Sequence, residues 1–118
     1  MQRRTALFAL PALATLPLSA AAQAWPVKPL RLVIPFPAGG ATDIVGRLLA
    51  QKLGAALGQQ VVIDNKPGAG GTIGADLVAK APADGHTLLL ATSSTHSIGP
   101  ALNPKMPYDA FKDFAPIA

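Results

Sequence analysis

The sequence of 118 residues has no cysteine and no glutamate, and aromatic residues make up only 5% of it. Without cysteine there is no disulfide framework, no thiolate metal site and no cysteine nucleophile. The two histidines lie on separate segments, so we expect no metal site. No G-x-x-x-x-G-K-[ST] motif occurs, which excludes a P-loop. The fold therefore depends on its apolar core alone.

The formal net charge is +4, from ten basic and six acidic residues. Nucleic-acid-binding domains gather their Lys and Arg residues on one face or along one helix. Here the basic residues are spread singly along the chain, so we expect no nucleic-acid partner.

Residues 1–24 have the pattern of a secretory signal peptide. Two arginines near the start are followed by the uncharged run TALFALPALATLPLSAAAQA, which ends on Ala22-Gln23-Ala24. The sequence predicts cleavage after Ala24, and the arginine pair leaves the general secretory and twin-arginine export routes open. A membrane anchor is the alternative, because the run is long enough to span a bilayer. Two prolines within the run favour the cleaved leader.

Three continuous apolar runs, at 30–34, 61–63 and 87–91, are typical of buried parallel strands. Apolar residues at helical spacing predict a helix over 44–57 and a shorter one over 73–81. The order β-α-β-α-β predicts an α/β domain with a parallel sheet and right-handed crossovers. Beyond the third run we expect a loop with one short helix. Three strands with an open end form an unfinished domain.

The first helix carries an apolar stripe that we expect to face the sheet. Its members repeat at intervals of three and four: Ile44, Val45, Leu48, Leu49, Leu53, Ala56 and Leu57.

Ligands of open α/β sheets bind outside the carboxyl ends of the strands, where three loops emerge here. In the first loop, PFPAGGATD, Gly39 and Gly40 predict a sharp turn that a ligand can approach closely. Thr42 is the expected N-cap of the following helix, with Asp43 in its first turn. The free N–H groups of a helix start can bind an anion. The alternative, in which the glycines only make the turn, stays open.

The other two loops carry weaker signals. The second contains GAGGTIG, whose glycine spacing is one residue too long for a dinucleotide fingerprint. It also follows the second strand, whereas that fingerprint follows the first. Both features favour a structural turn, or further N–H groups that face a ligand, over an NAD site. The third loop, TSSTHS, offers hydroxyls to a small polar ligand. No G-x-S-x-G elbow surrounds its serines, so the sequence gives no support to nucleophilic catalysis.

Residues 25–118 resemble the Bug-type receptors, which are the extracytoplasmic solute-binding proteins of tripartite tricarboxylate transporters. The resemblance rests on PFPAGGATD, on N-x-PGAGG and on PYD-x-x-KDFAP, and it covers essentially all of the sequence after the leader. One departure is His86, because the family usually has Tyr at this position.

The resemblance implies a two-lobed α/β fold of the type II periplasmic-binding-protein kind, of which residues 25–118 form part of the first lobe. It implies a periplasmic receptor, monomeric when complete, that captures a small carboxylate and passes it to membrane permease subunits without a cofactor, a metal or chemistry of its own. The alternatives from other classes are a nucleotide-binding α/β enzyme domain and a non-functional truncated remnant. The implied ligand-binding residues are Phe36, Gly39, Gly40, Ala41, Thr42, Asp43, Gly70, Gly71, Ser93, Ser94, Thr95 and His96.

Overall fold

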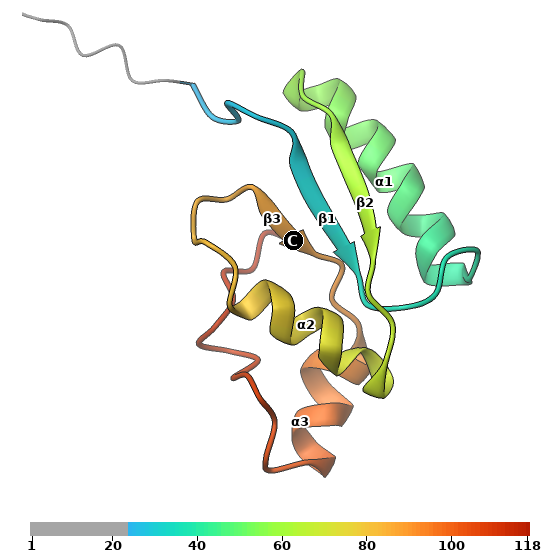
Figure 1. Ribbon diagram of the computed structural model, residues 1–118, viewed down its shortest axis with the longest axis vertical. Coiled ribbons are helices and arrows are strands. Elements are labelled where there is room, and N and C mark those ends of the chain that lie inside the picture. The colour runs from blue at the N-terminus through green and yellow to red at the C-terminus, as the bar shows by residue number, and fades with distance from the viewer. Residues whose placement is uncertain (1–23) are drawn as a thin grey trace, which may run out of the picture.

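The structure of the protein is a computed structural model that describes residues 24–118 (Figure 1). The predicted leader therefore lies outside the described residues, apart from Ala24. In chain order the main elements are β1 (Leu30–Ile34), α1 (Ala41–Leu57), β2 (Val61–Asn65), α2 (Thr72–Ala79), β3 (Thr87–Leu89) and α3 (Gly99–Leu102).

The three strands form one parallel sheet in the order β2-β1-β3. The crossover from β1 to β2 and the crossover from β2 to β3 run in opposite directions across the sheet. Two right-handed crossovers of opposite direction place their helices on opposite faces. Figure 1 accordingly shows α1 on one side of the strands and α2 on the other. The predicted α/β architecture with a parallel sheet is confirmed.

The central strand β1 carries the core. Leu32, Val33 and Ile34 are at most 2% exposed, because β1 has a partner strand on each edge and a helix on each face. The edge strands are only half-buried, and their lengths differ from the prediction. In-register pairing with β1 extends β2 to Asn65, whereas β3 ends at Leu89 rather than at residue 91.

The predicted core-facing stripe of α1 is wrong in its first two turns. Four of its members are exposed to between 44% and 64%, namely Ile44, Val45, Leu48 and Leu49. The helix instead buries its small residues Gly46 and Ala50 against the sheet. At Gly46 a Cβ would collide with the Ile34 side chain, so α1 lies too close to the sheet for a large residue there. Close packing of small residues outweighs the periodicity of the large ones.

The segment after β3 contains more helix than expected. The π-helix η2 (Ser94–Ile98) leads directly into α3, and both lie where the sequence predicts a loop with one short helix. Residues 103–118 follow without a further strand or helix. Within residues 24–118, none of the helices combines the length and apolar character needed to cross a membrane.

The exposed face of α1 predicts self-association of the protein. Replacing Leu48, which is 58% exposed, with Gln should change the free energy of unfolding by no more than about 0.5 kcal/mol and should reduce the associated fraction. Sedimentation velocity and urea unfolding measure the two effects. The control Ala50→Gln places a polar group against the sheet and should destabilise the fold strongly. An unchanged associated fraction in Leu48→Gln would contradict this prediction.

Candidate functional site

The first loop ends at a helix start that no side chain caps. Gly40, rather than the predicted Thr42, is the N-cap of α1, and no side chain caps the helix. The N–H of Ile44 donates to the carbonyl of Gly40, while those of Ala41, Thr42 and Asp43 precede the first helical bond. Uncapped N–H groups at the start of a 17-residue helix attract negative charge.

The two glycines of this loop have different roles. Gly39 has φ +87°, a conformation that favours glycine, whereas Gly40 has φ −77° and ψ 172°, which any residue can adopt. The predicted need for sharp turning therefore holds for Gly39 and is wrong for Gly40. Both glycines are exposed, and a Cβ at Gly40 would come no closer than 3.5 Å to a neighbour.

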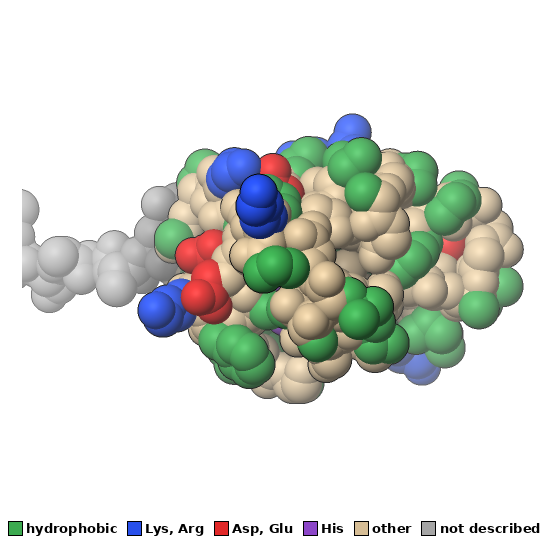
Figure 2. All heavy atoms as spheres, turned by 90° about the horizontal axis from the view of Figure 1, so that it is seen from below, with side chains coloured by type: hydrophobic (Ala, Val, Ile, Leu, Met, Phe, Trp, Pro, Cys, Tyr) green, Lys and Arg blue, Asp and Glu red, His purple; other side chains and the backbone are tan. Residues whose placement is uncertain are grey.

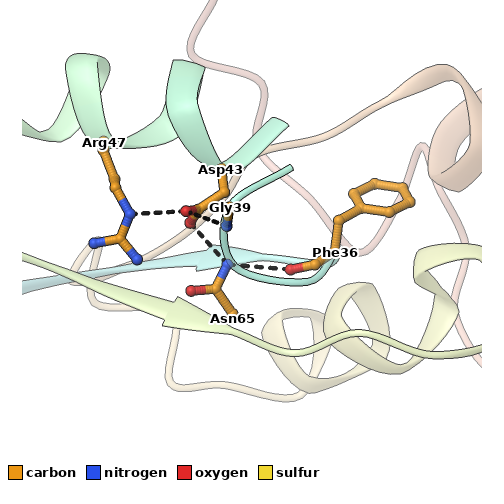
Figure 3. A network of polar contacts seen from close by, with 5 residues as sticks. All are labelled: Phe36, Gly39, Asp43, Arg47 and Asn65. Atoms are coloured by element: carbon orange, nitrogen blue, oxygen red, sulfur yellow. Dashed lines mark hydrogen bonds and ion pairs between the residues drawn. The ribbon is translucent and has the colours of Figure 1, made fainter. Parts of the chain in front are cut away.

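A buried carboxylate holds the first loop in place (Figure 3). Asp43, only 2% exposed, lies in the first turn of α1 as predicted, and its Oδ2 accepts hydrogen bonds from the Gly39 N–H at 2.9 Å and the Arg47 side chain at 2.8 Å. Its Oδ1 accepts from the side-chain amide of Asn65 at 2.9 Å. The same amide donates to the carbonyl of Phe36 at 3.1 Å. Asp43 thus ties the loop to α1 and, through Asn65, to the end of β2.

These donors favour the ionised form of Asp43. The Arg47 hydrogen bond contributes most, followed by those of Gly39 and Asn65, and together they lower the pKa of Asp43 from 3.8 to about 2, although burial acts in the opposite direction. A lowered folded-state pKa adds stability that is present above the ordinary value and is lost as the pH falls toward 2. The carboxylate is therefore fully charged at neutral pH.

The second loop has an unusual backbone that its glycines permit. The consecutive residues Gly68, Ala69, Gly70 and Gly71 all have positive φ, and they include the 3₁₀ turn η1 (Ala69–Gly71). Gly71 is the N-cap of α2 and is buried. A Cβ at Gly71 would lie 2.7 Å from Cγ2 of Thr95 and 3.4 Å from the Phe36 ring. Only glycine lets the three loops meet here.

The third loop is centred on Thr95, which is fully buried. Its hydroxyl donates to the Thr92 carbonyl at 2.9 Å and accepts from the Thr92 N–H at 3.0 Å. The same oxygen lies 2.9 Å from Nδ1 of His96. Nearby, the hydroxyls of Thr92 and Ser94 are 2.9 Å apart. The hydroxyls expected to face a ligand are thus partly engaged with one another.

The structure brings Phe36, Gly71 and Thr95 together at one point, one residue from each loop. The other predicted residues surround this point or extend from it. Exposed among them are Gly39, Gly40, Ala41, Gly70 and Ser93; partly buried are Thr42, Ser94 and His96. Figure 2 views the side toward which the strands point. Most of the charged side chains in this view lie toward the grey trace, while the rest of the face is hydrophobic side chains and tan surface of other side chains and backbone.

This edge of the sheet is open rather than enclosed. A hollow of about 540 Å³ lies instead between α3 and residues 103–113 and shares only Tyr108 with the surroundings of Thr95. Another, of about 400 Å³, lies between α1 and β2 and is lined by Arg47 and Ile63 among others. Among residues 24–118, no group of His, Asp or Glu side chains could hold a metal ion. The three loops lie together at the carboxyl end of the sheet.

Sequence reasoning missed Arg47, Asn65 and Tyr108. The position of Asn65 at the end of the second strand was a usable signal, because parallel strands end at one edge of the sheet. Arg47 lies four residues after Asp43, the spacing of a helical ion pair. Tyr108, whose hydroxyl donates to the Thr95 carbonyl at 2.7 Å, lies 13 residues away with no periodic pattern to connect the two.

Solved structures define the class of protein to which this arrangement belongs. The periplasmic binding protein BugD matches 79% of the chain with a TM-score of 0.75 at 44% identity, and the match covers 31% of BugD. MatC from Rhodopseudomonas palustris, solved with bound malate, matches 78% with a TM-score of 0.74 at 46% identity, over 31% of its length. The fold is that of a periplasmic binding protein, present in part.

The family follows from the sequence. The profile of the family described as "Tripartite tricarboxylate transporter family receptor" matches residues 45–118. Protein BugT of Bordetella pertussis is 46% identical over 98 residues, which are 82% of this chain and 30% of BugT. The chain therefore belongs to the family of tripartite tricarboxylate transporter receptors, which are solute-binding proteins, and spans about a third of the length of these relatives.

Removing the charge of Asp43 tests its part in holding the first loop. Asp43→Asn should destabilise the protein at neutral pH and should flatten the loss of stability between about pH 4 and pH 2.5, because the depressed pKa is gone. Urea unfolding across this range measures both effects. Amide exchange at Gly39 should also become faster, since its acceptor has lost its charge.

The matched control is Asp84→Asn at the opposite end of the sheet. The pKa of Asp84 is also lowered, mainly by the His86 N–H, so this variant should lose its own pH-dependent stability. It should leave amide exchange at Gly39 unchanged. Equal exchange rates at Gly39 in both variants would contradict the assigned role of Asp43.

Proposed function

We propose that residues 25–118 form one wall of the carboxylate site of an exported receptor, which delivers its ligand to the permease subunits of a tripartite tricarboxylate transporter. The observation that carries this proposal is the uncapped start of α1, which leaves the N–H groups of Ala41, Thr42 and Asp43 without helical acceptors. The loop PFPAGGATD, to which these residues belong, contains no Lys or Arg. The malate bound to MatC supports a small carboxylate as the ligand class.

In this proposal the anion is held by dipoles rather than by an ion pair within the first and third loops. Backbone N–H groups at the helix start meet the carboxylate, and the side chains of Thr42 and Ser93 add neutral hydrogen bonds, directly or through water. The charge of Asp43 is offset by its ion pair with Arg47, and its two oxygens are already occupied by hydrogen bonds from Gly39, Arg47 and Asn65. The loops bind and orient the ligand and do no chemistry.

The other wall of the cleft would come from sequence that these relatives have and the described residues do not. This accounts for the open edge at the three loops. A nucleotide-binding domain is the competing function, and only the glycine-rich second loop favours it. In the structure, Gly71 of that loop lies so close to Thr95 and Phe36 that a side chain would not fit, so packing explains the glycine without a nucleotide.

A chimera tests the proposed site. Residues 25–118 would replace the matching segment of MatC, and calorimetry would measure malate binding to the product. Thr42→Ala and Ser93→Ala should each weaken binding by about 1 kcal/mol, roughly fivefold, for one lost neutral hydrogen bond. Ser97→Ala is the matched control, because Ser97 is exposed on the π-helix that follows Ser93 and is not a predicted ligand residue. Binding of ATP or NAD in place of malate would favour the competing function.

The salt dependence of malate affinity separates dipoles from ion pairs. We expect the dissociation constant of the chimera to change little between low and high ionic strength, because short contacts from fixed dipoles in a closed cleft are weakly screened. A steep loss of affinity with salt would instead assign the recognition to a cation outside the first and third loops.

Export is a separate part of the proposal. Cleavage after Ala24 would leave Trp25 as the first residue, and in the structure its ring lies 5.9 Å from that of His86, the residue that departs from the family. Amino-terminal sequencing of periplasmic protein should begin at Trp25. Recovery of the intact chain from the membrane fraction would support the anchor instead.

A further inference from the structure

The carbonyl of Thr95 lacks the backbone donor that its helix would normally supply. In the π-helix η2 the N–H of Gly99 donates to the carbonyl of Ser94, five residues earlier. The next bond of this pattern would join residue 100 to Thr95, but residue 100 is proline and has no N–H. A buried carbonyl without a partner costs free energy comparable to a lost hydrogen bond.

The sequence favours this π-turn in two ways. A Cβ at Gly99 would collide with the carbonyl oxygen of Ser94, so glycine is required where the turn closes. Pro100 has no N–H, so the next five-residue bond, from residue 100 to the Thr95 carbonyl, cannot form. π-Turns occur frequently at functional sites, and this one lies in the third loop.

Tyr108 supplies the missing donor. Its hydroxyl donates to the Thr95 carbonyl at 2.7 Å, and the residue is only 6% exposed. Burial raises the pKa of Tyr108, so the phenol keeps its proton at neutral pH. Tyr108 therefore joins the segment that follows α3 to the third loop.

The same segment also encloses His96. The ring of His96 lies 4.7 Å from that of Phe114 and 6.2 Å from that of Tyr108, and the Tyr108 and Phe114 rings meet edge to face at 5.6 Å. These ring contacts fix the plane of the imidazole.

The hydrogen bonds of Thr95 define the tautomer of His96. The single hydroxyl proton of Thr95 is donated to the Thr92 carbonyl, and the oxygen accepts from the Thr92 N–H. With the hydroxyl proton assigned to the Thr92 carbonyl, the Nδ1 of His96, 2.9 Å from the Thr95 oxygen, takes the donor role. Neutral His96 carries its hydrogen on Nδ1 and leaves Nε2 as an acceptor.

From this geometry we propose that Tyr108 is a positioning residue of the third loop: by satisfying the Thr95 carbonyl it fixes Thr95 against Gly71 and holds His96 in its Nδ1–H form. The motif PYD-x-x-KDFAP, which the proposed function leaves without a role, thereby acquires one. The consequence for ligand affinity rests on the proposed carboxylate site, whereas the conformation of the loop does not.

The first test needs no ligand. In ¹⁵N-histidine NMR spectra of the chain, His96 should show the Nδ1–H tautomer, and Tyr108→Phe should convert it to a mixture of tautomers. Phe111→Leu is the matched control, because Phe111 belongs to the same segment and is 86% exposed, so its spectrum should equal that of the unmodified chain. The signal of His86, in another part of the fold, serves as the internal reference in every sample.

A rescue distinguishes the missing hydrogen bond from general loss of packing. Pro100→Ala supplies an N–H at the position that the π-turn leaves vacant, so it should restore the Nδ1–H signal in the Tyr108→Phe background. The proposal is overturned if Tyr108→Phe leaves the His96 signal unchanged. It is also overturned if the double variant gives the same spectrum as Tyr108→Phe. NMR spectra of the unmodified chain that show no contact between His96 and the rings of Tyr108 and Phe114 would overturn it as well.

The second test uses malate as the probe in the chimera with MatC. Tyr108→Phe should raise the dissociation constant by about five- to tenfold, as expected for one lost buried hydrogen bond, and Phe111→Leu should leave it unchanged. Binding that is equal in Tyr108→Phe and its parent overturns the link between Tyr108 and the site. Absence of malate binding in the parent overturns the proposed function instead, and the NMR result then decides the positioning role by itself.

Discussion

The pairing of β1 on both of its edges is the constraint on which the rest of the structure depends. Its register with β2 and β3 ends all three strands at one edge of the sheet, so their loops emerge side by side. Parallel strands also require crossovers, and the return from β2 to β3 places the two long helices on opposite faces. The loop that follows β1 therefore lies between the other two, with Phe36 beside both Gly71 and Thr95.

Each loop is then fixed by a contact from elsewhere in the chain. The first is held by Asp43 on α1 and Asn65 on β2, the second by the close approach of Gly71 to Thr95, and the third by Tyr108. Most of these contacts use buried polar groups, which are costly when left unpaired. The loops thus have little conformational freedom, which would reduce the ordering cost of binding the proposed ligand.

The sequence predicts the strands and the fold class well because both depend on local apolar runs. It predicts the location of the candidate site because parallel strands share a carboxyl edge. It fails on the facing of α1, where Gly46 and Ala50 set the distance to the sheet and the larger Ile44 and Leu48 are left outside. It also fails to give Tyr108 a role, because that role depends on a proline eight residues earlier that removes a donor. Such dependence between distant residues has no periodic signature.

The bond between Asp43 and the Gly39 N–H also limits what the first loop can offer to an anion. With that donor engaged, the start of α1 retains the three N–H groups of Ala41, Thr42 and Asp43. One carboxylate presents two oxygens with about four lone-pair positions, so three donors are matched to a single carboxylate and leave nothing for another. In a dicarboxylic acid, the first loop would therefore read one end only. The distance between the two acid groups, and with it the length of the acid that is accepted, would be measured by other parts of the cleft.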